Sequence, residues 1–327
     1  MMKGIVIDKE GESYIRKLKN DLTIPKIEKD EILIETHYGG LNFADLMMCN
    51  GTYPHPKGYP LIAGLELSGI VTECGQDVKE FLPGDRVVGF SEDAGAFSDF
   101  CKLKSGAVTK ILDGISLSDA AAYFVQATTA YHLLHTIGNI NSNQIILVHA
   151  IGGGVGLNLV QLAKSVGAKV IGTVGTTGKE KKPYDCGADL VIDRSKSNFV
   201  EEINEKYGKN SIDILIDSTG AEILDSSFNL MKKLSHIISY GEASGKPYKN
   251  LWEKLVEKSL TFSRLHIGHM DFLSSYWSDA QFDIQNKIYK KELKIFVEKI
   301  FELEDFDNLY NLLATRNVAG KLLIKFK

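Results

Sequence analysis

The fold is decided by the stretch Gln-Ile-Ile-Leu-Val-His-Ala-Ile-Gly-Gly-Gly-Val-Gly, residues 144–156. It predicts a short strand rich in β-branched residues that runs directly into a glycine-dense turn. Apolar residues then recur at helical spacing as far as Val166, and Gly167 is placed to end that helix. This order suits a nucleotide pyrophosphate, because a glycine backbone can approach the phosphates and a helix N-terminus offers unpaired N–H groups.

The glycine turn alone leaves an ordinary tight turn open as an alternative. The strict pattern G-x-G-x-x-G is not met, because Ile151 stands where its first glycine would be. The pattern that fits is A-x-x-G-x-x-G over Ala150, Gly153 and Gly156. The next predicted strand, residues 169–174, begins where a βαβ unit of about thirty residues would place it. That context favours a dinucleotide site.

Length and composition narrow the class of protein. With 327 residues the chain exceeds the usual size of a single core, so two domains are expected. The net charge of −4, without a dense Lys/Arg stripe, disfavours a nucleic-acid surface. No apolar run is long enough to span a bilayer, and the N-terminus lacks a signal-peptide pattern. The four cysteines lie far apart and suit a reducing cytosol, so a cytoplasmic location is expected.

The pattern of elements changes along the chain. Residues 1–123 read as short strands separated by turns, which predicts a compact, partly barrel-like β domain. Residues 124–263 alternate strands with helices, which predicts a doubly wound parallel sheet and hence an α/β protein. In residues 264–327 we predict an amphipathic helix near 291–303 and a last strand over 321–326. This tail is expected to pack back on the first domain, so that the dinucleotide domain is an insertion. The predicted strands of that domain are 144–149, 169–174, 189–193, 212–217, 235–240 and 259–265.

The loop after the second of these strands bears on the choice of cofactor. A site that prefers NAD usually carries Asp or Glu there, which binds the ribose hydroxyls. Here the strand is followed by Gly-Thr-Thr-Gly-Lys at residues 175–179, without a carboxylate. Hydroxyls and an ammonium can donate to a 2′-phosphate, so NADPH is favoured. Lys182 and Arg194 are further cationic candidates. The alternative is that residues 176–179 merely begin the next helix, with the lysine in solvent.

A catalytic zinc would need three ligands from Cys, His or carboxylates. Leu65 and Asn42 stand where such ligands would be useful, and neither binds zinc well. A structural zinc lobe would need closely spaced cysteines, which the chain lacks. His132 and His135 are three residues apart within an otherwise packed predicted helix. The sequence therefore predicts no metal.

Several segments together resemble the zinc-free medium-chain dehydrogenase/reductases. Within them the chain is most similar to the NADPH:quinone oxidoreductase (zeta-crystallin) group, and there to the vesicle amine transport protein branch. The resemblance covers nearly the whole chain and does not identify the substrate. It rests on residues 40–47 (Gly-Leu-Asn-Phe-Ala-Asp-Leu-Met), 64–66 (Gly-Leu-Glu), 83–87 (Pro-Gly-Asp-Arg-Val), 95–98 (Gly-Ala-Phe-Ser), 149–156 and 317–321 (Asn-Val-Ala-Gly-Lys).

The resemblance implies a GroES-like catalytic domain and a Rossmann domain with the active cleft between them. It also implies a homodimer formed through the edges of the Rossmann sheets, near residues 258–269. Asn42 would lie beside the nicotinamide, and Thr129 would contact it from the helix that begins near Gln126. Gly241 would follow the fifth strand along the cofactor, and Lys321 would lie near the phosphate end.

The phosphates of NADPH would be held by the Rossmann domain. Thr176 and Lys179 would bind the 2′-phosphate, and Arg194 lies on the same rim. The pyrophosphate would be cradled by the glycine turn, namely Gly152, Gly153, Gly154, Val155 and Gly156.

Three departures from the family pattern affect the substrate pocket. Met47 stands where quinone reductases often carry a tyrosine, Gln126 stands where many have a lysine, and Arg194 replaces a common tyrosine near the adenosine. The pocket is therefore expected to differ from that of a model quinone reductase.

Two functions remain open at this stage. The first is an NADPH-dependent reductase of a quinone or an α,β-unsaturated carbonyl, in which hydrogen-bond donors stabilise the oxygen that gains charge. Asn42 could donate through its amide, and Tyr53 through its hydroxyl unless it is only a packed loop aromatic. Without zinc, alcohol oxidation is disfavoured. The second is an NADPH-binding protein of the vesicle amine transport type with little or no catalytic activity.

Overall fold

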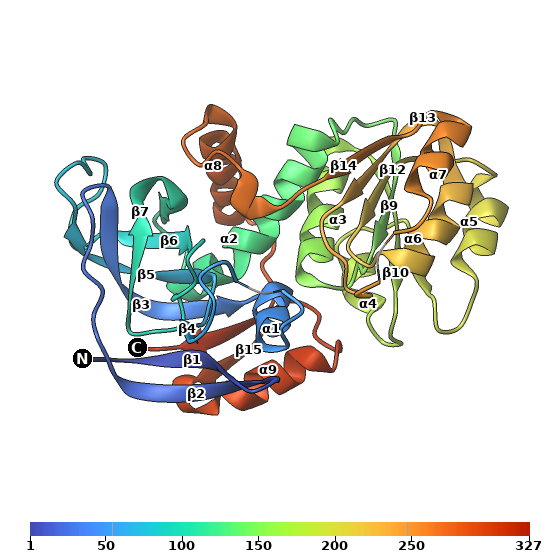
Figure 1. Ribbon diagram of the computed structural model, residues 1–327. Coiled ribbons are helices and arrows are strands. Elements are labelled where there is room, and N and C mark those ends of the chain that lie inside the picture. The colour runs from blue at the N-terminus through green and yellow to red at the C-terminus, as the bar shows by residue number, and fades with distance from the viewer. Residues whose placement is uncertain (54, 247) are drawn as a thin grey trace. The chain divides into compact units, whose positions relative to one another are not determined.

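The structure is a computed structural model that describes residues 1–53, 55–246 and 248–327. The chain divides into two compact units (Figure 1). Unit 1 consists of Met1–Val125 and Asp271–Lys327, and unit 2 of Gln126–Met270. Unit 2 is thus an insertion between two parts of unit 1.

Unit 1 is rich in strands that form two sheets. Its helices are α1 (Phe43–Cys49), α8 (Ser275–Tyr289), α9 (Phe306–Ala314) and the first part of α2 (Leu117–Tyr131). Its strands are β1 (Met2–Glu10), β2 (Ser13–Leu22), β3 (Glu31–Leu41), β4 (Leu61–Ile62), β5 (Glu66–Cys74), β6 (Arg86–Phe90), β7 (Phe100–Lys104), β8 (Val108–Lys110), β15 (Val297–Glu302) and β16 (Lys321–Lys325). The larger sheet has the order β15-β16-β3-β5-β6-β8, with β7 also paired to β3, and the smaller has the order β2-β1-β4.

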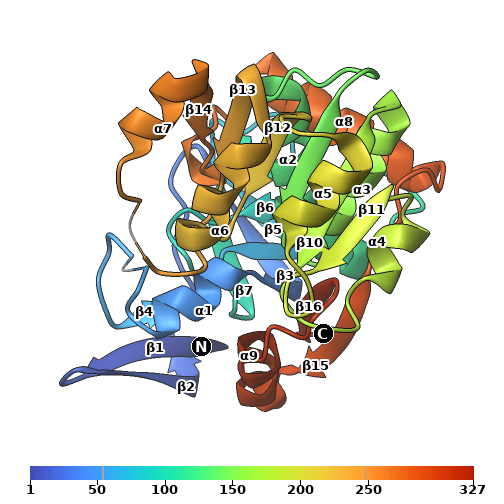
Figure 2. The same ribbon diagram turned by 90° about the vertical axis from the view of Figure 1, so that its right-hand side faces the viewer.

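The C-terminal tail differs from the prediction at one element. Residues 291–303 are not a helix, because they contain strand β15, which pairs in parallel with β16. Ile300 lies opposite Leu323, and Phe301 is buried at 3% exposure. The pairing of this edge strand with its neighbour prevails over its helix-like pattern. The helix of this region is α9, which packs against β15 and β16 (Figure 2).

Unit 2 is a parallel sheet of the order β11-β10-β9-β12-β13-β14. Its strands are β9 (Ile145–His149), β10 (Lys169–Val174), β11 (Leu190–Asp193), β12 (Ile212–Asp217), β13 (Met231–Ser239) and β14 (Thr261–Arg264). The helices between them are α3 (Gly154–Val166), α4 (Lys181–Asp185), α5 (Phe199–Tyr207), α6 (Ala221–Ser227) and α7 (Leu251–Lys258). The doubly wound sheet predicted from the sequence is confirmed.

Helices cover both faces of this sheet. Figure 1 shows α3 on one side and α5 with α7 on the other. Buried strand residues such as Leu147 and Leu215 pack against Phe199 and Ile203 of α5 and Leu224 of α6. Each such side chain contributes about 1.5–3 kcal/mol to folding by leaving water. Because the strands are parallel, their carboxyl ends meet at one edge of the sheet, where ligands bind in this class of fold.

The boundaries of unit 2 differ from the predicted residues 124 and 263. The unit begins at Gln126, inside α2, and ends at Met270, beyond the predicted end. The end is later because β14 pairs with β13, and because the backbone N–H of Leu265 donates to Ser239 O at 2.9 Å. In the described part of the chain, no helix has the length and apolar character that a membrane span requires.

Candidate functional site

The glycine turn joins the carboxyl end of β9 to the start of α3. Ala150, directly after β9, has a left-handed backbone with φ of 55°. Gly153 is the N-cap of α3, and no side chain caps the helix at that residue. The helix ends at Val166, and Gly167, which was predicted to stop it, is a left-handed C-cap with φ of 88°. Backbone N–H groups in the first turn of α3 could therefore donate hydrogen bonds to a phosphate.

The glycines of the turn are needed for different reasons. A methyl group at Gly156 would overlap the backbone of Ile151, so this glycine permits the close approach of α3 to the turn that follows β9. A methyl group at Gly154 would overlap the carboxamide of Gln126 on α2. At Gly153 the nearest atom to such a methyl would be the carbonyl oxygen of Ala150, at 3.3 Å. Gly153 is therefore the position that the protein itself constrains least.

The predicted lysine of the 2′-phosphate site lies against this turn. A methyl group at Gly152 would be 3.0 Å from the carbonyl oxygen of Lys179 and 3.1 Å from its Cβ. The loop after β10, which carries Lys179 and the half-buried Thr176, thus packs on the glycine turn. Val155, in the first turn of α3, is also half-buried.

Arg194 supplies a second positive charge at this edge of the sheet. It follows β11, and a methyl group at Gly175 would lie 3.1 Å from its Nη2. Its Nε is buried and has no hydrogen-bond partner among the described residues. Burial lowers the pKa of the guanidinium, and attraction to Asp217 and Asp193 opposes this shift. Arginine stays charged through such shifts, so an unsatisfied cationic donor lies beside the loop after β10.

Sequence reasoning missed one carboxylate at this edge. Asp193, the last residue of β11, accepts hydrogen bonds from Thr177 Oγ1 at 2.6 Å and from Ser195 Oγ at 2.6 Å. These bonds hold the pKa of Asp193 well below its usual range. The NAD-type acid is expected after the second strand of the sheet, whereas this one comes from the third. The backbone N–H of Ser195, at 2.9 Å from Oδ1, and Lys196 Nζ, at 3.3 Å from Oδ2, also face this carboxylate. With four donors around it, Asp193 is not a vacant acceptor for ribose hydroxyls.

Two further predicted cofactor residues lie in unit 2. Thr129 is buried on α2, at 7% exposure. Gly241 follows β13 and packs on Ser218, because a methyl group there would be 3.1 Å from the carbonyl oxygen of Ser218. These two residues therefore come from different elements of the same unit.

In unit 1 the structure brings Asn42 and Lys321 together with Glu66. The Asn42 Oδ1 accepts from Lys321 Nζ at 2.8 Å, and Asn42 Nδ2 donates to Glu66 Oε2 at 3.0 Å. Lys321 and Glu66 also form an ion pair, and neither side chain is exposed. The second N–H of Asn42 points to the carbonyl oxygen of Gly40, at 3.2 Å.

Asp45 supports the same cluster from α1. Its Oδ2 accepts from the backbone N–H of Asn42 at 2.8 Å, and the residue is fully buried. Burial raises the pKa of Asp45 to about 7, although the hydrogen bond from Asn42 and the charge of Lys321 oppose the shift. A buried carboxyl group of this kind is partly protonated at neutral pH.

The structure bears on two predicted residues of unit 1, Lys321 and Tyr53, and on one that was not predicted, Glu66. Glu66 was missed as a site residue, and the only signal for it was its place in the Gly-x-Glu turn. Lys321, predicted near the phosphate end of the cofactor, has Asn42 and Glu66 as its partners in this structure. Tyr53 is half-buried after α1, and its backbone N–H donates to Met47 O at 3.3 Å.

Among the described residues no group of three or more His, Cys, Asp or Glu side chains is placed to hold a metal ion.

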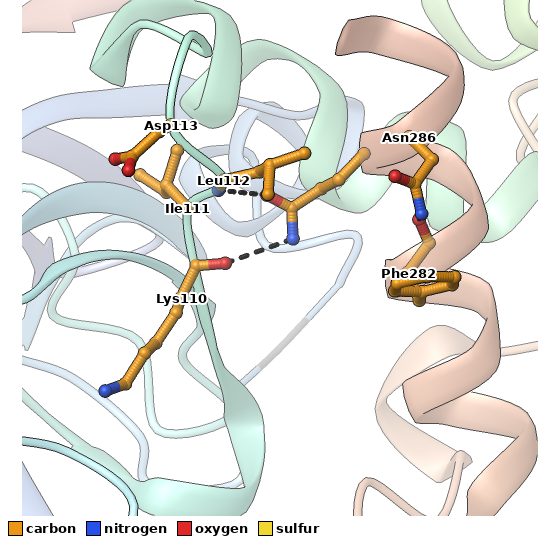
Figure 3. A pocket seen from close by; sticks show the side chains of 7 residues that line it. Lys110, Ile111, Leu112, Asp113, Phe282 and Asn286 are labelled. Carbon is orange, nitrogen blue, oxygen red and sulfur yellow. Dashed lines mark hydrogen bonds between the residues drawn. The ribbon is translucent and has the colours of Figure 1, made fainter.

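Unit 1 also has a cavity of about 360 Å³ between residues 110–113 and helix α8 (Figure 3). There Gln285 accepts from Leu112 N at 2.7 Å and donates to Lys110 O at 3.1 Å. None of the predicted site residues lines this cavity.

A GroES-like unit joined to a parallel-sheet dinucleotide unit is the architecture of medium-chain dehydrogenases and reductases. Residues 28–131 match the family "Alcohol dehydrogenase GroES-like domain", and residues 154–295 match the family "Zinc-binding dehydrogenase". Quinone oxidoreductase 1 of Escherichia coli is 30% identical over 299 residues, which cover 90% of this chain and 91% of that protein. The chain belongs to the quinone oxidoreductase family of this superfamily.

Other relatives agree with this assignment. The quinone oxidoreductase of Salmonella typhimurium is 34% identical over 215 residues, which cover 66% of this chain and 65% of that protein. The synaptic vesicle membrane protein VAT-1 homolog of Danio rerio is 26% identical over 92% of this chain and 65% of that protein. The crystal structure of Escherichia coli quinone oxidoreductase complexed with NADPH superposes with a TM-score of 0.91 at 28% identity, over 99% of this chain and 100% of that chain.

Proposed function

We propose that the protein is an NADPH-dependent oxidoreductase that transfers a hydride to a quinone or an α,β-unsaturated carbonyl. The observation that carries this proposal is the turn at Gly152–Gly156, where the α3 N-terminus, without a side-chain cap, lies close to Lys179. The residues present fit the cofactor, because no side chain caps the α3 N-terminus and Arg194 holds an unpartnered buried donor beside the loop after β10. The NADPH-bound relative supports the same choice.

In this proposal unit 2 binds and orients the cofactor. Gly152, Gly153, Gly154, Val155 and Gly156 hold the pyrophosphate. The 2′-phosphate is held by Thr176, Lys179 and Arg194, each of which can donate to phosphate oxygens. Thr129 and Gly241 line the rest of the dinucleotide. When bound, NADPH supplies the hydride.

The residues of unit 1 act at the reacting end. We place Asn42 beside the nicotinamide and Tyr53 beside the substrate oxygen. Both N–H bonds of the Asn42 amide already have acceptors, Glu66 and Gly40. Donation from Asn42 to a substrate oxygen would require one of these bonds to break, so we assign the donor role to Tyr53.

The experiment is steady-state oxidation of NADPH with 1,4-benzoquinone, 9,10-phenanthrenequinone and short 2-alkenals, repeated with NADH. We expect turnover with at least one acceptor and a higher kcat/KM with NADPH. Equal activity with both cofactors would contradict the roles of Thr176, Lys179 and Arg194. The Tyr53→Phe variant should lower kcat while NADPH still binds, because the ring is kept and only the hydroxyl is lost.

Both N–H bonds of the Asn42 amide are directed to acceptors within the protein, which favours a second candidate function. This candidate is an NADPH-binding protein with little or no turnover. The similarity to the VAT-1 homolog supports it as well. Tight NADPH binding in a fluorescence titration, without oxidation by any acceptor of the panel, would establish this second function in place of the first.

We also propose a zinc-independent, cytoplasmic homodimer. Asn42 and Leu65 are poor zinc ligands, so dialysis against a chelator should leave the rate of NADPH oxidation unchanged. The four cysteines are unpaired, which suits a reducing compartment. Strand β14 is the edge of the unit 2 sheet, and Thr261 and Arg264 are exposed on it. Light scattering at several protein concentrations tests the dimer, and a monomer mass throughout would exclude it.

A further inference from the structure

We propose that Glu66 and Lys321 are positioning residues that hold the Asn42 side chain in one of its two amide orientations. We call Glu66 and Lys321 the clamp. The inference rests on the proposed function, in which Asn42 lies beside the reacting end of the cofactor.

The chemistry of the clamp permits only one orientation of Asn42. An ammonium only donates hydrogen bonds and an ionised carboxylate only accepts them. Lys321 therefore faces the amide oxygen, at 2.8 Å, and Glu66 faces the amide nitrogen, at 3.0 Å. Turning the amide over would place its N–H₂ against the ammonium and its oxygen against the carboxylate. Both contacts would then be repulsive, and both charged side chains are fully buried.

The clamp is itself held by elements far apart in the sequence. The second oxygen of Glu66 accepts from the backbone N–H of Val125 on α2, at 2.7 Å. Gly40 packs closely on the pair, since a methyl group there would be 2.7 Å from Lys321 Cε and 2.8 Å from Glu66 Oε2. Neither charged group can therefore move without disturbing β3, α2 or β16.

The orientation decides what Asn42 can offer a ligand. Both of its N–H bonds are directed to acceptors of the chain, whereas its oxygen has two lone pairs and the structure uses one, for Lys321. Asn42 thus meets a bound molecule as an acceptor. A hydroxyl or an amide N–H of the dinucleotide is a suitable partner, and an anionic substrate oxygen is not.

The test is the double variant Glu66→Gln with Lys321→Met, which removes both charges and keeps the approximate size of both side chains. The carboxamide introduced by Glu66→Gln would accept from Val125 and present its own N–H₂ to Asn42, which disfavours the native amide orientation of Asn42 and favours the inverted one. A matched control is Glu31→Gln with Lys102→Met, which removes an ion pair of 2.8 Å on β3 and β7.

We expect kcat of the clamp variant to fall about ten-fold or more, corresponding to about 1.4 kcal/mol, while the KM for the quinone changes less than about three-fold. The control pair should leave both values within about two-fold. A clamp variant with the kcat of the control would overturn the proposal. Thermal unfolding monitored by circular dichroism separates lost positioning from lost folding.

A second arm removes Asn42 itself. If the clamp acts through Asn42, the clamp substitutions should change kcat less than about two-fold in an Asn42→Ala background, because nothing remains to be positioned. A merely structural role of the clamp predicts the same loss in both backgrounds. That outcome would refute positioning.

A third readout does not depend on turnover. In the cofactor-free protein, the two side-chain amide protons of Asn42 should give separate, slowly exchanging NMR signals, and the clamp variant should lose this protection. Unprotected signals in the unsubstituted protein would refute the clamp even if the enzyme is active. If no acceptor is reduced but the signals are protected, the proposed function fails and the clamp stands.

Discussion

The two candidate sites of this molecule are built in opposite ways. In unit 2 the site depends on residues without side chains, because Gly152, Gly154 and Gly156 let chain segments approach each other closely. In unit 1 it is made of buried charged side chains, and Lys321 lies 279 residues from Asn42 and 255 from Glu66. The first joins segments that lie fairly close in the sequence, such as Gly152 and Lys179, whereas the second needs the C-terminal strand β16 to fold against β3.

The two sites therefore gain their specificity in different ways. Backbone N–H groups at the α3 N-terminus favour any phosphate, so the selection among dinucleotides falls to side chains on the loop after β10 and to Arg194. The cluster of unit 1 carries its own fixed charges and has no need of an external ion to orient Asn42.

The largest effect is expected for the pH dependence of folding stability, to which a buried acid and a buried base contribute in opposite directions. The pKa of Asp45 is raised to about 7, so between about pH 4 and 7 the folded state binds the proton more tightly and stability falls as pH rises. Burial lowers the pKa of His149, in unit 2, to about 3, so its contribution rises from about pH 3 to 6.5. At about 1.4 kcal/mol per pKa unit, each change amounts to as much as about 4–5 kcal/mol.

Urea unfolding at several pH values measures both. Asp45→Asn should gain stability relative to the unsubstituted protein as pH rises from about 4 to 8, because the variant has no charge to bury. The stability of His149→Gln should instead lack the rise that His149 contributes between about pH 3 and 6.5. Parallel curves for the unsubstituted protein and Asp45→Asn would show that this carboxyl titrates normally.

The second prediction distinguishes Gly156, which the fold requires, from Gly153, which is required mainly for ligand binding. Gly156→Ala should lower the free energy of unfolding by about 2–3 kcal/mol, because its methyl group overlaps the backbone of Ile151. Gly153→Ala should change stability by less than about 0.5 kcal/mol, since its methyl group meets only Ala150 O, at 3.3 Å. Both variants should bind NADPH more weakly. Intact NADPH affinity in Gly153→Ala would refute the phosphate role of the turn.

The same contrast explains what the sequence could and could not predict. The sheet of unit 2 followed from local patterns, because each strand and its glycine or helix boundary are adjacent in the chain. The helix expected at residues 291–303 was wrong because the pairing of β15 with β16 is not a local property. Glu66 was missed for the same reason, since its partners come from α2, β16 and the residue before α1.

The third prediction tests the source of cofactor preference. Arg194→Gln should raise the dissociation constant of NADPH about ten-fold and leave that of NADH nearly unchanged, because only NADPH carries the 2′-phosphate. The control is Lys196→Gln, a neighbouring cation that is 58% exposed and paired with Asp193 at 3.3 Å. Fluorescence titration with both cofactors measures the effect. Equal losses for NADPH and NADH would assign Arg194 to the adenosine and not to the phosphate.

The smallest effect is expected at Ala150, a residue of the turn that has a left-handed backbone without being glycine. A left-handed backbone costs a non-glycine residue about 1–2 kcal/mol, and Ala150 adopts it with φ of 55°. Ala150→Gly removes that strain but adds about 0.4–1 kcal/mol of chain entropy to the unfolded state, so the net gain in urea unfolding should be about 0.5 kcal/mol. Ala163→Gly, inside α3, is the control and should destabilise by about 1 kcal/mol or more, since there the backbone gains nothing from glycine. A loss at position 150 as large as at 163 would mean that the Ala150 methyl group packs in the turn and outweighs the strain.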